Sequence, residues 1–203
     1  MSHVAMAREE WSRSLLAWAL RDAVLLVAMF GVWSALASWQ PSSASWPAAA
    51  LVAAASFGFA YVACYIAHEW GHDLGARAMG ASPSRGPATG FVMPLFDPRA
   101  HSRAQFYGLA YGGQLGYVAM AALLVAALEP DLAHRAAALG AVAFVVQSLY
   151  VDQGVLHRVW RGDDIAASIR EGAAAAVILR KTGLAWSLLA LALAALHALG
   201  GLP

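Results

Sequence analysis

The second apolar segment of the chain most constrains its fold, because it contains no charged residue from Pro47 to Ile66. A run of about 20 apolar residues is long enough to cross the hydrocarbon core of a membrane as a helix. The segment is followed directly by the sequence HEWGHD at residues 68–73, in which four side chains can ionise. Ionisable side chains are costly inside a membrane helix, so such a cluster near one end of a span indicates a functional site.

The composition of the whole chain places it among membrane proteins. Of its 203 residues, 61% are hydrophobic and 12% are charged, whereas soluble domains have about 25% charged residues. The net charge of +1 gives no support for a nucleic-acid partner; the expected surroundings are a lipid bilayer. The only cysteine, Cys64, excludes an internal disulfide and a multi-cysteine zinc site. We expect Cys64 to be a small core residue.

We expect an all-α polytopic membrane protein in which residues 1–203 form a single membrane domain. Apolar runs predict five membrane-spanning helices, at Leu15–Trp39, Ala48–Gly80, Gln105–Leu128, Ala133–His157 and Leu184–Leu199. The core of this domain is expected at residues 48–160, and residues 163–203 are expected to form an interfacial helix plus the final span. The interfacial helix is predicted at Ile165–Leu179, ended by the sequence RKTG at residues 180–183.

The first span contains two charged residues, and the second contains a glycine pattern. The first span is expected to be retained rather than cleaved as a secretory signal, because Arg21 and Asp22 interrupt the early part of its apolar run. Arg21 is close enough to the start of that span to extend its guanidinium to the membrane interface. In the second span, Gly71 and Gly75 form a G-x-x-x-G pattern that allows a neighbouring helix to approach closely.

Residues 81–103 interrupt the helical pattern, since prolines and glycines recur throughout the segment. Inside this break, residues 91–96 read FVMPLF and are strongly apolar. Such a segment is either a re-entrant or interfacial strand, which needs partners for its backbone at membrane depth, or an interfacial loop.

The distribution of basic residues predicts the orientation. Of the 13 lysines and arginines, only Arg135 falls on the far side of the five predicted spans. The positive-inside rule therefore places the N-terminus in the cytoplasm and the C-terminus outside. Abundant alanine and arginine with little lysine is typical of a GC-rich bacterial genome, so the bacterial cytoplasmic membrane is the expected location.

The sequence predicts a metal site formed by two helices. His68 and His72 are four residues apart and share one helix face, and Glu69 lies beside them where a carboxylate can reach a metal-bound water. Asp152 lies at a similar depth in the fourth predicted span, which runs in the same direction. Two histidines and one carboxylate form a zinc site that leaves the fourth position for water.

These motifs resemble the site-2 protease family of intramembrane zinc metalloproteases over about residues 60–160. The likeness consists of HEWGH at 68–72, LGA at 74–76, a glycine-rich third span and VDQG at 151–154. It implies that His68, His72 and Asp152 bind Zn²⁺ and that Glu69 is the general base. It also implies hydrolysis of a peptide bond within or next to a transmembrane helix of a membrane-protein substrate, with the apolar segment 91–96 near that substrate.

Differences from the family pattern keep two alternatives open. Where the family has L-D-G, this chain reads VDQG at 151–154, so its glycine comes one place late, at Gly154. The Asn and Pro that usually precede the aspartate in the family are missing. The family's G-P-x-x-N pattern in the third span is replaced by GQLGY at 113–117. The chain could accordingly be a catalytically altered member that serves as a non-catalytic subunit of a membrane complex. A membrane di-iron oxygenase or desaturase is the second alternative, in which His101 and His157 would add ligands, although no H-x-x-H-H pair is present.

Overall fold

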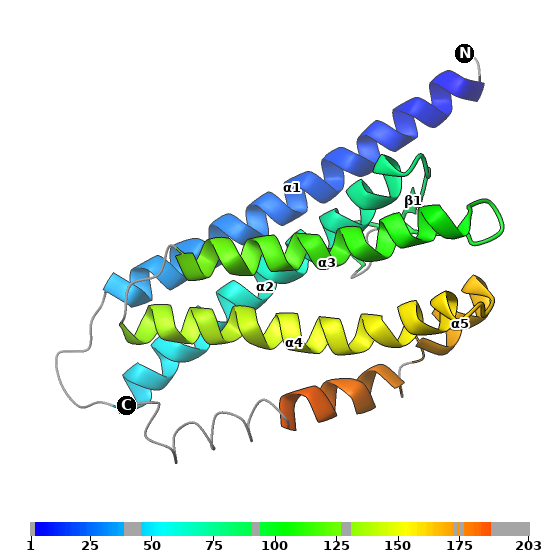
Figure 1. Ribbon diagram of the computed structural model, residues 1–203. Helices are drawn as coiled ribbons and strands as arrows, with labels where there is room; N and C mark the ends of the chain where they lie inside the picture. The colour runs from blue at the N-terminus through cyan, green and yellow to red at the C-terminus, as the bar shows by residue number, and fades with distance from the viewer. Residues whose placement is uncertain are drawn as a thin grey trace.

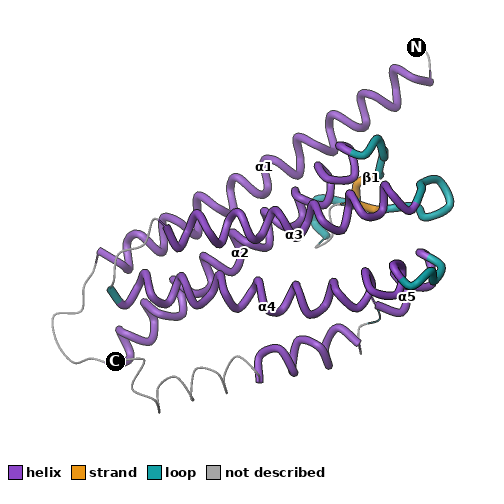
Figure 2. The backbone as a smooth tube through the Cα atoms, in the orientation of Figure 1, coloured by secondary structure: helices purple, strands orange, loops and turns teal. Residues whose placement is uncertain are grey.

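The computed structural model describes residues 3–38, 46–90, 94–126, 131–172, 174 and 177–187. Its framework consists of four long helices, α1 (His3–Ser38), α2 (Trp46–Ala78), α3 (Arg103–Ala126) and α4 (Leu132–Trp160). They lie alongside and across one another as a bundle, and α2 crosses behind α3 and α4 (Figure 1). A short helix, α5 (Ile165–Gly172), follows α4, and residues 177–187 form a further helix (Figure 2).

Each of the four long helices is long and apolar enough to cross a membrane. The candidate spans are Ser14–Ser38, Pro47–Ala78, Arg103–Ala126 and Leu132–Trp160. The first four predicted spans match these candidate spans to within a few residues at each end. In the part that the structure describes, the chain is a mostly helical membrane protein. The fifth predicted span, residues 184–199, lies outside the described residues from 188 onward.

The predicted interfacial helix at Ile165–Leu179 is wrong in its extent. Helix α5 ends at Gly172, and the next helix runs from 177 to 187, through the residues 180–183 that were expected to end it. A glycine such as Gly183 costs a helix only about 1 kcal/mol relative to alanine. Contacts with α4 offset that cost, because Trp186 donates a hydrogen bond to the side chain of Gln147 at 3.0 Å.

The break between α2 and α3 contains a small β-hairpin. Strands β1 (Ser84–Arg85) and β2 (Pro94–Leu95) pair antiparallel, with Ser84 opposite Leu95. The predicted interruption at 81–103 is confirmed, and the apolar segment 91–96 contains β2. Residues 91–93 of that segment lie outside the described residues.

Arg21 has partners within the protein, and whether it also reaches the membrane interface stays a prediction. Its guanidinium donates hydrogen bonds to the carbonyl oxygens of Ala88 and Gly90, at 3.1 and 2.8 Å, and pairs with Asp22 at 2.5 Å. It also lies over the ring of the fully buried Trp18. These contacts satisfy the charge within the fold, and they attach α1 to the loop that leads into β2.

The close contact between α2 and α3 depends on glycine. A Cβ added to Gly71 would collide with the carbonyl oxygen of Gly112, and one added to Gly75 would collide with that of Gly108. Similarly, a Cβ on Gly116 would meet the backbone of Ala67. The prediction that the G-x-x-x-G pattern lets a neighbouring helix approach is confirmed, and that neighbour is α3.

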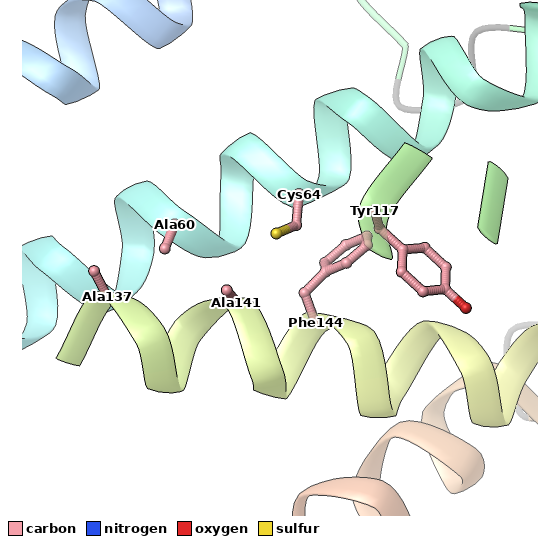
Figure 3. Packing of buried hydrophobic residues seen from close by; sticks show 6 residues of the cluster. All are labelled: Ala60, Cys64, Tyr117, Ala137, Ala141 and Phe144. Carbon is pink, nitrogen blue, oxygen red and sulfur yellow. The ribbon is translucent and has the colours of Figure 1, made fainter. Parts of the chain in front are cut away.

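The core between α2, α3 and α4 consists mainly of small side chains around two aromatic rings. Figure 3 shows its buried members, which are Ala60, Cys64, Tyr117, Ala137, Ala141 and Phe144. Alanines at the contacts let α4 approach α2, while the two rings fill the wider part of the space. Cys64 is fully buried in this cluster, as expected of a small core residue.

A buried ion cluster fixes the hairpin to the end of α2. The carboxylate of Asp73 is 1% exposed and pairs with Arg85 of β1 at 2.6 Å and with Arg77 at 2.9 Å. The side chain of Arg85 is 2% exposed, so this pair is removed from solvent. Removing one partner of a buried pair leaves an uncompensated charge, which is strongly destabilising.

We therefore expect Asp73→Asn to lower the free energy of unfolding by about 3–5 kcal/mol. Thermal unfolding of the purified protein in detergent measures the effect. Asp163→Asn is the matched control, because that side chain is exposed and a surface substitution changes stability by no more than about 0.5 kcal/mol. Equal melting temperatures for the two variants would contradict a stabilising role for the ion cluster.

Candidate metal centre

The two histidines of α2 direct their ring nitrogens toward each other. The Nε2 atoms of His68 and His72 are 3.1 Å apart, and Nδ1 of His72 lies 2.7 Å from the carbonyl oxygen of Leu109 on α3. A carbonyl oxygen can only accept, so Nδ1 of His72 carries the proton and donates it. In the neutral ring, the lone pair is then on Nε2. This Nδ1–H tautomer is the one that can bind a metal through Nε2.

Helix α3 leaves space for the His72 ring because residue 113 is glycine. A Cβ at Gly113 would overlap three atoms of the His72 imidazole. Sequence reasoning noted Gly113 only as part of a family pattern, and it did not identify Leu109. No sequence signal marks Leu109, since its contribution is a backbone carbonyl.

Asp152 of α4 reaches the same place. The ligand atoms of His68, His72 and Asp152 all lie within 4.8 Å of one another. Within the part of the chain that the structure describes, Oδ2 of Asp152 is buried without a hydrogen-bond partner. Buried polar atoms are nearly always paired, so this oxygen requires a further partner, and a bound cation would provide one.

The geometry of the three side chains fits a zinc ion. Two nitrogen ligands at about 2.0–2.1 Å from a tetrahedral zinc lie about 3.3 Å from each other. The Nε2 atoms of His68 and His72 are 3.1 Å apart, and a carboxylate oxygen of Asp152 lies within 4.8 Å of the ligand atoms of both histidines. The three residues that sequence reasoning selected as ligands are therefore the ones that lie together.

Glu69 lies at the edge of this group. Glu69 is 6% exposed, and its carboxylate is close enough to that of Asp152 for the two charges to interact. Two acidic side chains therefore lie near each other in the bundle. A cation bound between the helices would offset the repulsion between them.

Trp70, which lies between the two histidines in the sequence, connects the motif to α1. The indole Nε1 of Trp70 donates a 2.7 Å hydrogen bond to Oδ2 of Asp22, which is buried. On the other side, the rings of Tyr117 and Phe144 lie 5.4 and 5.7 Å from the ring of His68. Sequence reasoning missed the contact between Trp70 and Asp22, because it joins residues that are far apart in the chain.

A lysine from the last described helix also approaches the group. Nζ of Lys181 donates a 3.0 Å hydrogen bond to the carbonyl oxygen of Val151, and a Cβ at Gly154 would collide with this nitrogen. The pKa of Lys181 is lowered, first by burial; the charge of Asp152 acts against this, and Arg158 and Arg180 act with it. Sequence reasoning assigned Lys181 to a helix end and gave it no role at the site.

The remaining histidines considered as ligands lie elsewhere. His101 accepts a hydrogen bond from the backbone of Ser82 in the loop before α3, and His157 is exposed on α4. Among the residues whose placement is described, His68, His72 and Asp152 are the one group of three side chains able to hold a metal. This number of ligands suits one metal ion better than two.

Comparisons with protein-family models, with curated proteins and with solved structures find no match. Arguments about function therefore start from the geometry of the site and from the motifs that form it.

Proposed function

We propose that this chain is an intramembrane zinc metalloprotease of the site-2 protease type. Its reaction would be hydrolysis of a peptide bond within or next to a transmembrane helix of a membrane-protein substrate. The observation that carries the proposal is the convergence of His68, His72 and Asp152 from two helices that are each able to cross a membrane. Glu69 lies beside them and belongs to the same helix as the two histidines.

The proposed roles follow from the chemistry of each side chain. His68, His72 and Asp152 would hold the zinc ion, and the carbonyl oxygen of Leu109 fixes the tautomer of His72. When bound, zinc supplies Lewis acidity, which acidifies water and polarises a peptide carbonyl. Glu69 accepts a proton from the attacking water and delivers it to the leaving amine as the C–N bond breaks.

The substrate would have to be unwound where it is cut. In a helix each carbonyl oxygen accepts a hydrogen bond from the amide four residues later, and side chains surround the backbone. A site buried between α2, α3 and α4 reaches such a carbonyl only after local unwinding. We propose that the apolar segment 91–96, which contains β2, lies next to the unwound stretch as a re-entrant or interfacial segment.

We further propose five spans in the bacterial cytoplasmic membrane, with a cytoplasmic N-terminus and an external C-terminus. Support comes from the arrangement of the connections, because the hairpin, the loop before α3 and α5 lie at one end of the bundle (Figure 1). Arginines lie at this end, among them Arg85, Arg103 and Arg170. Basic residues favour the cytoplasmic side of a membrane.

Metal analysis of the purified protein tests the proposal. We expect about one zinc per chain in the wild type and less than about one tenth of that in His72→Ala, which loses a ligand. His157→Ala is the matched control and should keep its zinc, because His157 is exposed and outside the group. Two irons per chain would favour the oxygenase alternative. A chain without metal that copurifies with another membrane protein at fixed stoichiometry would favour a non-catalytic subunit.

A further inference from the structure

We propose that Lys181 is a built-in counter-ion of the metal site, which balances the carboxylate of Asp152 in the metal-free protein and weakens the binding of a divalent cation. This inference rests on the metal site of the proposed function and adds a residue that tunes it. Lys181 would act through its charge, as a positioning residue, and would not touch the metal or the substrate.

The structure holds the ammonium group of Lys181 at a defined point. Its Nζ is fixed by the carbonyl oxygen of Val151 at 3.0 Å, and the absence of a side chain at Gly154 provides the space that it occupies. The helix of residues 177–187 is itself attached to α4, because Trp186 donates a hydrogen bond to Gln147 at 3.0 Å. The helix, the space at Gly154 and the carbonyl of Val151 therefore together fix the position of the Lys181 ammonium group.

The ammonium group acts on Asp152 through space. Charge interactions connect Asp152 with Lys181 on one side and with Glu69 on the other. Oδ2 of Asp152 has no hydrogen-bond partner among the residues that the structure describes. Lys181 therefore interacts with Asp152 through its charge and does not donate a hydrogen bond to this oxygen. Arg158, which also faces Lys181, is paired with Glu171 of α5.

The sign of the effect follows from Coulomb's law. At similar distances, a single positive charge repels a divalent cation about twice as strongly as it attracts one carboxylate. Lys181 therefore stabilises the metal-free site, where its charge offsets that of Asp152, and it opposes the binding of a divalent cation. Removing its charge should lower the stability of the metal-free protein and raise its affinity for zinc, whereas the loss of a mere packing contact would lower both.

Three variants test this inference in detergent solution at pH 8. Lys181→Met removes the charge at similar length, and Gly154→Ala moves the ammonium group away while keeping it. Gly183→Ala is the control on the same helix, because a Cβ there meets nothing within 4 Å. The measurements are zinc affinity, by competition with a chromogenic chelator, and the melting temperature of the metal-free protein.

We expect both Lys181→Met and Gly154→Ala to lower the dissociation constant for zinc, by about tenfold or more for Lys181→Met. The metal-free melting temperature of Lys181→Met should fall by about 3 °C. Gly183→Ala should bind zinc as the wild type does and should not lower the melting temperature. Unchanged or weaker zinc binding in Lys181→Met and Gly154→Ala would overturn the role of Lys181 while leaving the proposed function intact. A wild-type chain that binds no zinc would overturn both.

Discussion

Glu69→Gln is expected to reduce proteolysis by about 1,000-fold or more while the protein keeps one zinc per chain. The amide cannot accept the proton of the attacking water, but Glu69 is not among the three side chains that would hold the metal. A tagged single-span reporter, whose transmembrane helix contains a helix-breaking Asn-Pro pair, can be co-expressed with the protein. Loss of the cleaved band, together with metal analysis of the same preparation, measures both effects.

The matched control for this substitution is Glu171→Gln. Glu171 is exposed on α5 and pairs with Arg158, away from the metal ligands. This variant should cleave the reporter as the wild type does. Normal cleavage by Glu69→Gln would show that another group moves the proton, and the mechanism would be rejected even if zinc were present.

Gly112→Leu is expected to disrupt the fold and abolish zinc binding. A side chain at this position has to displace the backbone of Gly71 and Gly75, which cannot move aside as a flexible side chain would. Overpacking ordinarily costs about 1–3 kcal/mol, and a collision with backbone belongs at or above the upper end of that range. Separation of α3 from α2 would also remove the Leu109 carbonyl from His72, so the melting temperature and the zinc content should fall together.

Gly31→Leu provides the comparison, because a Cβ at Gly31 on α1 has no neighbour within 4 Å. It introduces the same side chain into a membrane-spanning helix without a collision, so it should not lower the melting temperature and should leave the zinc content unchanged. If Gly112→Leu retains the wild-type melting temperature, the glycine contact between α2 and α3 is not what holds these helices together.

The long helices could be predicted from the sequence because each one is a continuous apolar run of residues. Long apolar runs gave the four helices that the structure describes as candidate spans. The i, i+4 spacing of His68 and His72 placed two imidazoles on one face. Asp152 required an argument about depth and direction, since nothing near it in the chain indicates which helix it faces. The structure brings its carboxylate to the histidines.

The features that sequence reasoning missed depend on contacts between distant segments. The sequence did not show the partners of Arg21, because a helix considered alone in lipid offers its arginine none. In the fold, the loop carbonyls of Ala88 and Gly90 provide them. The position of Lys181 likewise depends on a missing side chain at Gly154, a relationship visible only once the two helices are packed.

The contact that orients His72 has a practical consequence for anyone mapping this protein by scanning mutagenesis. The oxygen that accepts from Nδ1 belongs to the main chain of Leu109, and every substitution at that position, alanine included, retains it. A systematic scan would therefore report only on the packing of the Leu109 side chain against the cluster that contains Phe106 and Leu156, and it would miss the hydrogen bond to His72. Backbone chemistry, such as an ester in place of the amide that contains this carbonyl, would weaken the acceptor and expose its importance.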